Sequence, residues 1–477
     1  MLDEVKGLNE ECGIFGIFNS NEAAKLTYEG LHSLQHRGQE GAGIVSFDGD
    51  ERHTYKGLGL LSSIFKDTTI LDDLTGTSAI GHLRYATAGS HGLNNIQPFN
   101  FQLPNLDFSL AHNGNLTNAK TLKKELLNQN VEFVSDSDSE ILGRLIEKSN
   151  ENTFIEKIKS SLQKLRGGFA FILMTKDQMF AALDPNGFRP LVIGQKDDGS
   201  YVFCSETCAL NQVHSTYIRD VEPGEIVYIE NNQLKSCFYT AKTKLSVCSL
   251  EYVYFASSDS VIRGVSVHEA RKEMGSNLAK EHPVNADVVL GVPNSSLSAA
   301  LGYAKSSGIP YDMGMIKNQY IARTFIEPTQ KKRERGVSMK LSVVRPVVEG
   351  KDVVLVDDSI VRGTTSRFIV KLLRDAGAKS IHVRIASPVL KYPCFYGVDI
   401  QTTNELIGAN KTVDEIRQEI GADSLEYLSV DGLKQSINLN SDNEFSGLCT
   451  AYFDGKYPTK LYDYEAQLHQ ELEKINV

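Results

Sequence analysis

Apolar and polar positions alternate in two different ways along the chain, and the second half has the clearer pattern. Residues 286–292, 353–356 and 381–385 are predicted strands, and the uninterrupted apolar run of the second suits a parallel sheet covered on both faces. Residues 297–304 and 368–376 have helical apolar spacing and follow two of these strands. Strands that alternate with helices predict an α/β domain.

The first half places short β-like runs, such as residues 108–111, between polar, glycine-rich segments. These segments cover residues 32–43, 81–87 and 111–116. Strands that deliver polar loops to one edge suit an antiparallel sandwich with a functional site at its rim. Two large domains are predicted, because 477 residues are too many for one hydrophobic core.

Composition narrows the class of protein further. A hydrophobic content of 41% and a charged content of 23% are typical of a globular protein, and a net charge of −10 does not favour nucleic acid. No apolar run approaches the ~20 residues of a membrane span. Residues 1–11 are acidic and lack the apolar core of a secretory signal, so we expect a cytoplasmic protein with reduced thiols.

Residues 353–365 combine a strand, a polar loop and the start of a helix. Asp357 and Asp358 stand where the strand ends, and hydroxyl and glycine residues follow. Free backbone N–H groups and the helix dipole favour an anion there, and the two carboxylates could hold sugar hydroxyls or a metal. The alternative is an ordinary strand-to-helix turn in which the aspartates cap the helix.

This stretch resembles the ribose-5-phosphate loop of type I phosphoribosyltransferases. The resemblance implies that 5-phosphoribosyl 1-pyrophosphate (PRPP) is bound by Asp357, Asp358, Ser359, Gly363, Thr364, Thr365 and Lys317. It also implies that the loop at residues 293–296 meets pyrophosphate and that Ser295, with the two aspartates, forms a Mg²⁺ site. Mg²⁺ commonly takes few protein oxygens and several from substrate phosphates.

A basic segment lies between these two loops. Residues 317–340 include several lysines and arginines, which alone would indicate a solvated charged loop. Next to two phosphate-binding loops, we interpret the segment as a lid that closes over a polyanionic substrate and excludes water.

Cys12 opens the apolar run of residues 12–18. A cysteine there would ordinarily be a buried core residue. If residues 1–11 were removed, however, the thiol of Cys12 would lie beside its own α-amine. An α-amine has a pKa near ~8 and can act as the general base for the adjacent nucleophile.

The polar segments together resemble the glutamine amidotransferase domain of the N-terminal nucleophile (Ntn) hydrolases, from Cys12 to about residue 240. The resemblance implies that Cys12 attacks the glutamine amide while Asn113 and Gly114 form the oxyanion hole. It assigns Arg84 to the α-carboxylate of glutamine and Asp138 to its α-ammonium group.

Each of these residues also has a structural interpretation. Asn113 and Gly114 form a common turn dipeptide, Asp138 could cap the helix expected from Glu140, and Arg84 could be a surface charge. The histidines of these segments, His36 and His82, are interpreted as structural, because the α-amine already supplies a base.

Three cysteines match an iron–sulfur site found in one branch of the amidophosphoribosyltransferase family, which the chain as a whole resembles. Cys248, Cys394 and Cys449 correspond to three ligands of a [4Fe–4S] cluster, and the fourth position is Tyr452. Four thiolates are the usual set, so we expect no cluster and interpret the cysteines as relics, with a non-cysteine fourth ligand left open.

In this order the two domains resemble the amidophosphoribosyltransferase family, and the resemblance spans nearly the whole chain. It divides the chain into a removable propeptide (1–11), an Ntn αββα glutaminase domain (12–245) and a phosphoribosyltransferase domain with a parallel sheet (246–477). The implied reaction converts PRPP, glutamine and water to 5-phosphoribosylamine, glutamate and pyrophosphate, with ammonia passing through an internal channel. A homotetramer inhibited by purine nucleotides is also implied.

Two alternative functions belong to other classes of protein. A PRPP-sensing regulator would keep the fold without turnover. A glutamine-dependent synthetase would need an ATP site or a sugar-isomerase pattern after residue 250, and the sequence shows neither.

Overall fold

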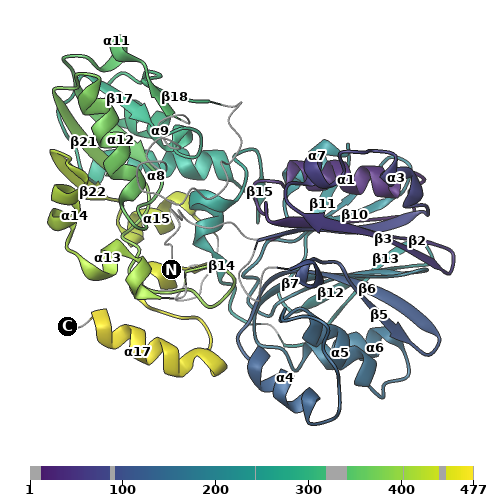
Figure 1. The fold of residues 1–477 in the computed structure, drawn as a ribbon. Helices are drawn as coiled ribbons and strands as arrows, with labels where there is room; N and C mark the ends of the chain where they lie inside the picture. The colour runs from purple at the N-terminus through teal and green to yellow at the C-terminus, as the bar shows by residue number, and fades with distance from the viewer. Residues whose placement is uncertain are drawn as a thin grey trace.

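The computed structural model describes residues 12–85, 92–241, 243–318, 341–400, 402–439 and 447–475. Figure 1 shows two lobes, a β-sandwich from the first half of the chain and an α/β lobe from the second. The predicted order, an antiparallel sandwich followed by a parallel sheet, is confirmed.

Two antiparallel sheets make up the first lobe. The first sheet contains β1 (Gly13–Phe18), β2 (Gly41–Asp48), β3 (Glu51–Leu58), β4 (Ser78–Arg84), β9 (Val192–Gln195), β10 (Tyr201–Cys204) and β11 (Thr216–Asp220). The second contains β5 (Phe99–Leu103), β6 (Leu106–Leu116), β7 (Gly167–Thr175), β8 (Met179–Leu183), β12 (Glu225–Glu230) and β13 (Gln233–Phe238). Their strand orders are β11-β9-β10-β1-β4-β2-β3 and β13-β12-β8-β7-β6-β5, so β1, β4 and β6 lie inside their sheets.

Helices cover the outer face of each sheet, which gives four layers (Figure 1). The first sheet carries α1 (Ala23–Ser33), α2 (Leu61–Ile64), α3 (Ile70–Asp73) and α7 (Thr207–Gln212), and the second carries α4 (Ala119–Leu127), α5 (Glu140–Lys148) and α6 (Phe154–Leu162). Side chains such as Ile14, Ala111 and Ile172 fill the space between the sheets. Alternate residues of each central strand therefore face an apolar layer on either side.

A four-stranded parallel sheet forms the centre of the second lobe. Its strands, in the order β17-β20-β21-β22, are β17 (Val288–Gly291), β20 (Asp352–Asp357), β21 (Ser380–Ile385) and β22 (Ser424–Tyr427). One face packs against α8 (Val267–Glu281), α9 (Leu297–Ser307) and α15 (Val430–Ile437), and the other against α12 (Thr364–Asp375) and α14 (Val413–Ile420). In β20, Val354 and Val356 enter the first apolar layer while Val353 and Leu355 enter the second, which explains the uninterrupted run.

Shorter elements complete the described chain. They are η1 (Leu93–Asn95), β14 (Val247–Cys248), η2 (Glu251–Phe255), β15 (Val261–Ile262), β16 (Val265–Ser266), β18 (Met315–Lys317), β19 (Leu341–Val343), α11 (Arg345–Val348), η3 (Thr403–Glu405), α13 (Ile407–Asn410), β23 (Leu448–Cys449), α16 (Ala451–Asp454), η4 (Tyr462–Tyr464) and α17 (Glu465–Ile475). The predicted boundary at residue 245 falls between β13 and β14, and it stays a prediction.

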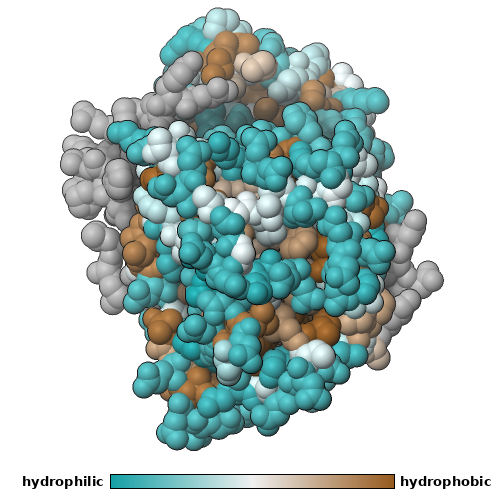
Figure 2. Space-filling view, turned by 90° about the vertical axis from the view of Figure 1, so that its right-hand side faces the viewer, coloured by the Kyte–Doolittle hydropathy of each residue, from teal (hydrophilic) through white to brown (hydrophobic). Residues whose placement is uncertain are grey.

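The face of the first lobe that Figure 2 shows is mostly hydrophilic, with apolar residues scattered among polar ones. Among the helices of the described residues, none is long and apolar enough to cross a membrane.

Helices α8 and α9 approach each other unusually closely, and glycine makes this approach possible. A Cβ atom added to Gly275 would lie 1.8 Å from the carbonyl oxygen of Ala299, and one added to Gly302 would lie 1.9 Å from that of Lys272. The two backbones therefore pack directly against each other beneath β17 and β20.

We predict that Gly302→Ala lowers the free energy of unfolding by about 1–3 kcal/mol, because the added methyl group must push two helices apart. The shift of the urea midpoint of the second domain measures the change. Leu301→Ala is the matched control, since this neighbouring side chain is 41% exposed and should change stability by less than about 0.5 kcal/mol. Equal midpoints for both variants would contradict the prediction.

Candidate active sites

Cys12 immediately precedes β1 and is almost fully buried, with 8% exposure. Its Sγ lies 3.6 Å from the carbonyl oxygen of Tyr85, the residue after β4. The Nε of Arg37 donates a hydrogen bond of 3.2 Å to the carbonyl oxygen of Cys12. The backbone of the predicted nucleophile is therefore fixed by the loop that follows α1, while its thiol faces the end of β4.

Asn113 and Gly114 lie inside β6, paired with Ala170 and Phe169 of β7, so their interpretation as a turn is wrong. Strands β1 and β6 pack across the sandwich. The buried Nδ2 of Asn113 has no hydrogen-bond partner among the described residues. A buried amide donor without a partner is costly, and a developing oxyanion would supply one.

The backbone at Gly114 admits only glycine. Its φ of +139° is strained for other residues, and a Cβ atom would lie 2.1 Å from the carbonyl oxygen of Gly168. The strand next to the predicted oxyanion hole thus depends on a close backbone approach.

Arg84 is the last residue of β4 and is 3% exposed, so its interpretation as a surface charge is wrong. Its Nη1 lies 3.7 Å from Oε1 of Glu40, a long ion pair. A buried guanidinium at a strand end, with planar donors, is well suited to bind a carboxylate in two places.

Asp138 does not cap α5, because its Oδ2 accepts a hydrogen bond of 2.8 Å from the backbone N–H of Leu116, at the end of β6. The N-cap of α5 is Ser139, without a side-chain cap. Burial raises the pKa of Asp138 to about 6, although hydrogen bonds from Leu116 and Ser139 oppose the shift. The carboxylate is therefore hydrogen-bonded to the strand that carries Asn113. A cationic ligand would stabilise its ionised form.

The neighbouring histidines are neutral. Burial lowers the pKa of His112 to about 3, although its Nδ1 lies 3.8 Å from Oδ1 of Asp138. Burial likewise lowers the pKa of His82 to about 3, and its Nε2 lies 3.0 Å from the carbonyl oxygen of His112. Neither ring supplies a counter-charge to Asp138.

The two predicted phosphate loops meet at the carboxyl ends of neighbouring strands. Strands β17 and β20 pair in parallel, with Gly291 opposite Val356, so the loops that follow them leave the same edge. Ser296 Oγ donates a hydrogen bond of 2.9 Å to Oδ1 of Asp357, and Ser295 Oγ donates one to Oδ2 of Asp358.

The two aspartates are buried side by side, which favours their protonated forms. Burial raises the pKa of Asp357, and the charge of Asp358 adds to the effect. Burial also raises the pKa of Asp358, opposed by the hydroxyls of Ser295 and Ser359 and by the charge of Arg271. A bound cation would favour the ionised pair.

The oxygen ligands at this edge fit Mg²⁺ only in part. In the ranges that the structure describes, no group of three or more His, Cys, Asp or Glu side chains is arranged to hold a metal ion. Asp357, Asp358 and Ser295 are hard oxygen ligands, and substrate oxygens would complete the usual octahedral set.

Gly363 ends the predicted phosphate loop with a φ of +74° and is the N-cap of α12. Thr364 and Thr365 are exposed in the first turn of this helix. Because α12 has no side-chain cap, the interpretation of Asp357 and Asp358 as helix caps is wrong.

The remaining residue predicted to bind PRPP stands at the edge of the described chain. Lys317 ends β18 and is exposed. Residues 319–340, most of the predicted lid, lie outside the described residues.

Tyr452 lies beside two of the three cysteines that match the family's iron–sulfur ligands. Cys248 and Cys449 face each other in the parallel pair β14–β23. The hydroxyl of Tyr452 lies 3.2 Å from Sγ of Cys248 and 3.3 Å from Sγ of Cys394, and all four side chains are buried. Burial raises the pKa of Cys449 to about 12. The fourth position holds a phenol in place of the usual fourth thiolate. These residues do not fit a [4Fe–4S] cluster.

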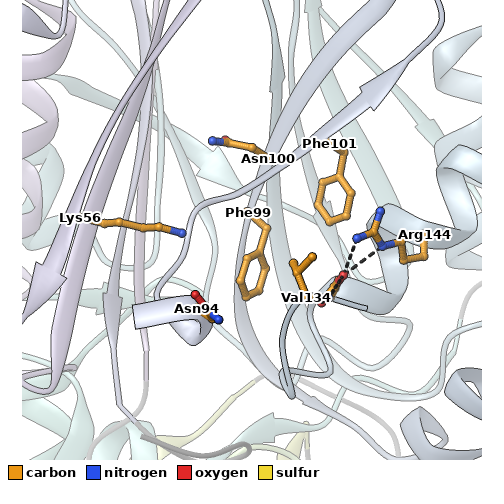
Figure 3. A pocket seen from close by; sticks show the side chains of 8 residues that line it. Lys56, Asn94, Phe99, Asn100, Phe101, Val134 and Arg144 are labelled. Carbon is orange, nitrogen blue, oxygen red and sulfur yellow. Dashed lines mark hydrogen bonds and ion pairs between the residues drawn. The ribbon is translucent and has the colours of Figure 1, made fainter. Parts of the chain in front are cut away.

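A separate pocket of about 420 Å³ opens on the first lobe between β3, β5 and α5 (Figure 3). Lys56 donates to the carbonyl oxygen of Ile96, and Arg144 is paired with Glu140. No residue predicted for either site lines it, and these charged lining groups have partners within the chain.

Buried ion pairs join the two lobes, and the sequence did not predict them. Arg37 pairs with Glu206 of the first lobe and Glu251 of the second. Arg189 lies near the same Glu251, at 3.7 Å. A charged residue in a polar segment predicts a loop or a scaffold position. No local sequence pattern therefore indicates that these side chains are buried together.

Two protein families match parts of the chain. The glutamine amidotransferase domain matches residues 82–212, and the phosphoribosyl transferase domain matches residues 267–392. Asn113 and Asp138 lie within the first match, and Asp357 lies within the second, while Cys12 precedes both. The chain is a glutamine amidotransferase joined to a phosphoribosyltransferase.

Curated relatives identify the combination. An amidophosphoribosyltransferase of Bacillus subtilis is 55% identical over 463 residues, covering 97% of this chain and 97% of the relative. One from Staphylococcus aureus is 54% identical over 467 residues, covering 98% of this chain and 94% of the relative. The chain belongs to the amidophosphoribosyltransferase family.

Solved structures agree with this assignment. An allosteric regulatory enzyme of purine biosynthesis superposes with a TM-score of 0.91 at 54% identity, covering 96% of this chain and 99% of that chain. A glutamine PRPP amidotransferase from B. subtilis, complexed with ADP and GMP, superposes with a TM-score of 0.90 at 54% identity, covering 94% of this chain and 98% of that chain.

We predict that the KM for glutamine rises as pH falls through about 6, because Asp138 then binds a proton and loses its attraction for an ammonium group. Asp138→Asn should raise this KM by about tenfold to a hundredfold, since a hydrogen bond to a charged group contributes ~1.5–3 kcal/mol. The variant should also lose the pH dependence. Steady-state kinetics with glutamine test both effects, and ammonia-dependent synthesis is the control. An unchanged KM would contradict the role of Asp138.

Proposed function

We propose that the protein converts PRPP, glutamine and water to 5-phosphoribosylamine, glutamate and pyrophosphate, the first step of purine synthesis. The observation that carries the proposal is the pairing of two sites in one chain. Cys12 and the unpartnered amide of Asn113 suit amide hydrolysis, and the loops after β17 and β20 suit a pyrophosphorylated sugar.

In the glutaminase site, we propose that removal of residues 1–11 frees the α-amine of Cys12. This amine takes the thiol proton, and the thiolate attacks the amide carbon of glutamine. The side chain of Asn113 and the N–H of Gly114 stabilise the resulting oxyanion. Ammonia leaves with the proton from the α-amine, and water then hydrolyses the γ-glutamyl thioester. Arg84 and Asp138 hold the two ends of the glutamine backbone.

In the second site, we propose that Ser359, Gly363, Thr364 and Thr365 bind the 5-phosphate at the N-terminus of α12. Asp357 and Asp358 hold the ribose, and Ser295 and Lys317 contact the pyrophosphate side. Mg²⁺, when bound, neutralises charge on the departing pyrophosphate. The chain's own contribution at C1 is positioning, since no side chain has to form a bond to the sugar.

Ammonia must reach C1 before bulk water protonates it, because ammonium is no nucleophile. We therefore propose an internal channel completed when the predicted lid, residues 317–340, closes. Closure would also exclude water that competes for C1.

Regulation and assembly extend the same proposal. The B. subtilis relative binds ADP and GMP, which supports feedback by purine nucleotides here. A homotetramer and a cytoplasmic location stay predictions.

Cys12→Ala should abolish synthesis with glutamine while leaving synthesis with ammonia within about twofold of the wild type, because only the thiolate is lost. Pyrophosphate release measures both reactions. Intact mass of the wild type should show that the chain begins at Cys12. Loss of both activities in a folded variant would contradict the two-site mechanism. A wild type that binds PRPP without turnover would favour the PRPP-sensing alternative.

We also propose that the protein binds no iron–sulfur cluster, because the hydroxyl of Tyr452 is hydrogen-bonded with two of the three cysteines and accepts from Cys394. Protein expressed with ample iron and purified without oxygen should carry far less than one cluster per chain by metal analysis. The iron content of the wild type is compared with that of Tyr452→Cys, because this variant supplies the fourth thiol of the usual ligand set. A wild type with stoichiometric iron would refute the proposal.

A further inference from the structure

The guanidinium of Arg37 is fully buried where the two lobes meet. Its Nη1 donates to Oε1 of Glu206 at 2.6 Å and to Oε2 of Glu251 at 2.9 Å, and its Nη2 donates to Oε1 of Glu251 at 2.8 Å. The third nitrogen, Nε, donates to the carbonyl oxygen of Cys12. One rigid planar group therefore contacts the predicted nucleophile and both carboxylates.

Glu251 belongs to the second lobe. It begins the turn η2, and its side chain is fully buried. A bidentate pair fixes the plane and rotation of a guanidinium more firmly than a single contact does. Since Nε lies in that same plane, the carboxylate of Glu251, together with that of Glu206, sets where Arg37 holds the carbonyl of Cys12.

Arg271 of α8 fixes the turn that carries Glu251. Its Nε donates to the carbonyl oxygen of Tyr252 at 2.8 Å, and its Nη2 donates to that of Ala256 at 2.8 Å. The third nitrogen, Nη1, donates to Ser258 Oγ at 3.0 Å. The position of Glu251 is thus set by the framework of the second lobe.

The second lobe also holds the strand of the oxyanion hole. Asn115 Nδ2 donates to the carbonyl oxygen of Phe395 at 2.9 Å. A Cβ atom on Gly397 would lie 3.2 Å from the backbone of Gly114. Both halves of the glutaminase site, nucleophile and oxyanion strand, therefore rest on residues of the phosphoribosyltransferase half.

We propose that Glu251 is a positioning residue for the glutaminase reaction, acting through Arg37 on the backbone of Cys12. The proposal rests on the proposed function, because it assumes that Cys12 attacks glutamine. A purely structural ion pair would stabilise the junction without favouring either reaction. Arg37 also donates from Nε to the backbone of Cys12 itself. Because of this contact, we expect the ion pair to position the nucleophile as well as to stabilise the junction.

Glu251→Gln is the test, because it keeps the shape of the side chain and removes one of the two carboxylate charges that hold Arg37, the one supplied by the second lobe. We expect kcat with glutamine to fall about tenfold to a hundredfold, as for other losses of alignment around a nucleophile. The KM for glutamine should change little, since Arg84 and Asp138 are untouched. Ammonia-dependent synthesis should stay within about twofold, because the second site keeps its fold.

Glu222→Gln is the matched control. Glu222 pairs with Arg263 of the second lobe at 3.2 Å, but this interlobe pair is partly exposed and contacts no predicted site residue. The control should keep both activities. A Glu251→Gln variant with normal glutamine kcat, or with equal losses of both activities, would overturn the proposal.

Two further measurements keep the test decisive. If Glu251→Gln does not fold, Glu251→Asp keeps the charge and shortens the side chain, and it should show the same selective loss to a smaller degree; an unselective result would refute positioning. The rate at which iodoacetamide alkylates Cys12, measured as a function of pH, should differ from the wild type in Glu251→Gln but not in Glu222→Gln. A wild type without glutaminase activity would refute the proposed function instead.

Discussion

The junction between the two lobes depends on buried charge that neither lobe can neutralise alone. Arg37 of the first lobe needs Glu251 of the second as well as Glu206 of its own, and Arg189 lies beside the same Glu251. Buried ions are costly unless they are paired, and removing one partner commonly costs ~3–5 kcal/mol. The lobes are therefore constrained to meet in one arrangement, and that arrangement is the one in which Cys12 is held.

The same junction explains why the two sites can share a chain. The loops after β17 and β20 leave one edge of the parallel sheet, while the segment at Phe395 reaches back to the strand of Asn113. An ammonia-producing site and an ammonia-consuming site are useful together only if their separation is fixed. Contacts between backbones and buried ions fix it better than a flexible linker would.

Local sequence pattern predicted the strands and the loops that follow β17 and β20, because these features are encoded within a few residues. The apolar run before Asp357 and the glycine at position 363 are examples, since burial on both faces and a positive φ leave direct traces. Asn113 and Gly114 were ambiguous, because a turn and a glycine-dependent strand use the same dipeptide. The pairing of Arg37 with Glu251 was not predicted. The two residues are 214 positions apart, and nothing near either one distinguishes a buried charge from a solvated one.

The tyrosine among the three cysteines has a consequence for how the protein persists in a cell. A domain whose interior is closed by an inorganic cluster must wait for its delivery and loses its core when the cluster is oxidised. Here the phenol of Tyr452 fills that place with atoms of the chain itself. On the proposal that the protein binds no cluster, folding of this lobe needs no metal supply, and its lifetime in air is set by its unfolding rate rather than by the chemistry of a cofactor.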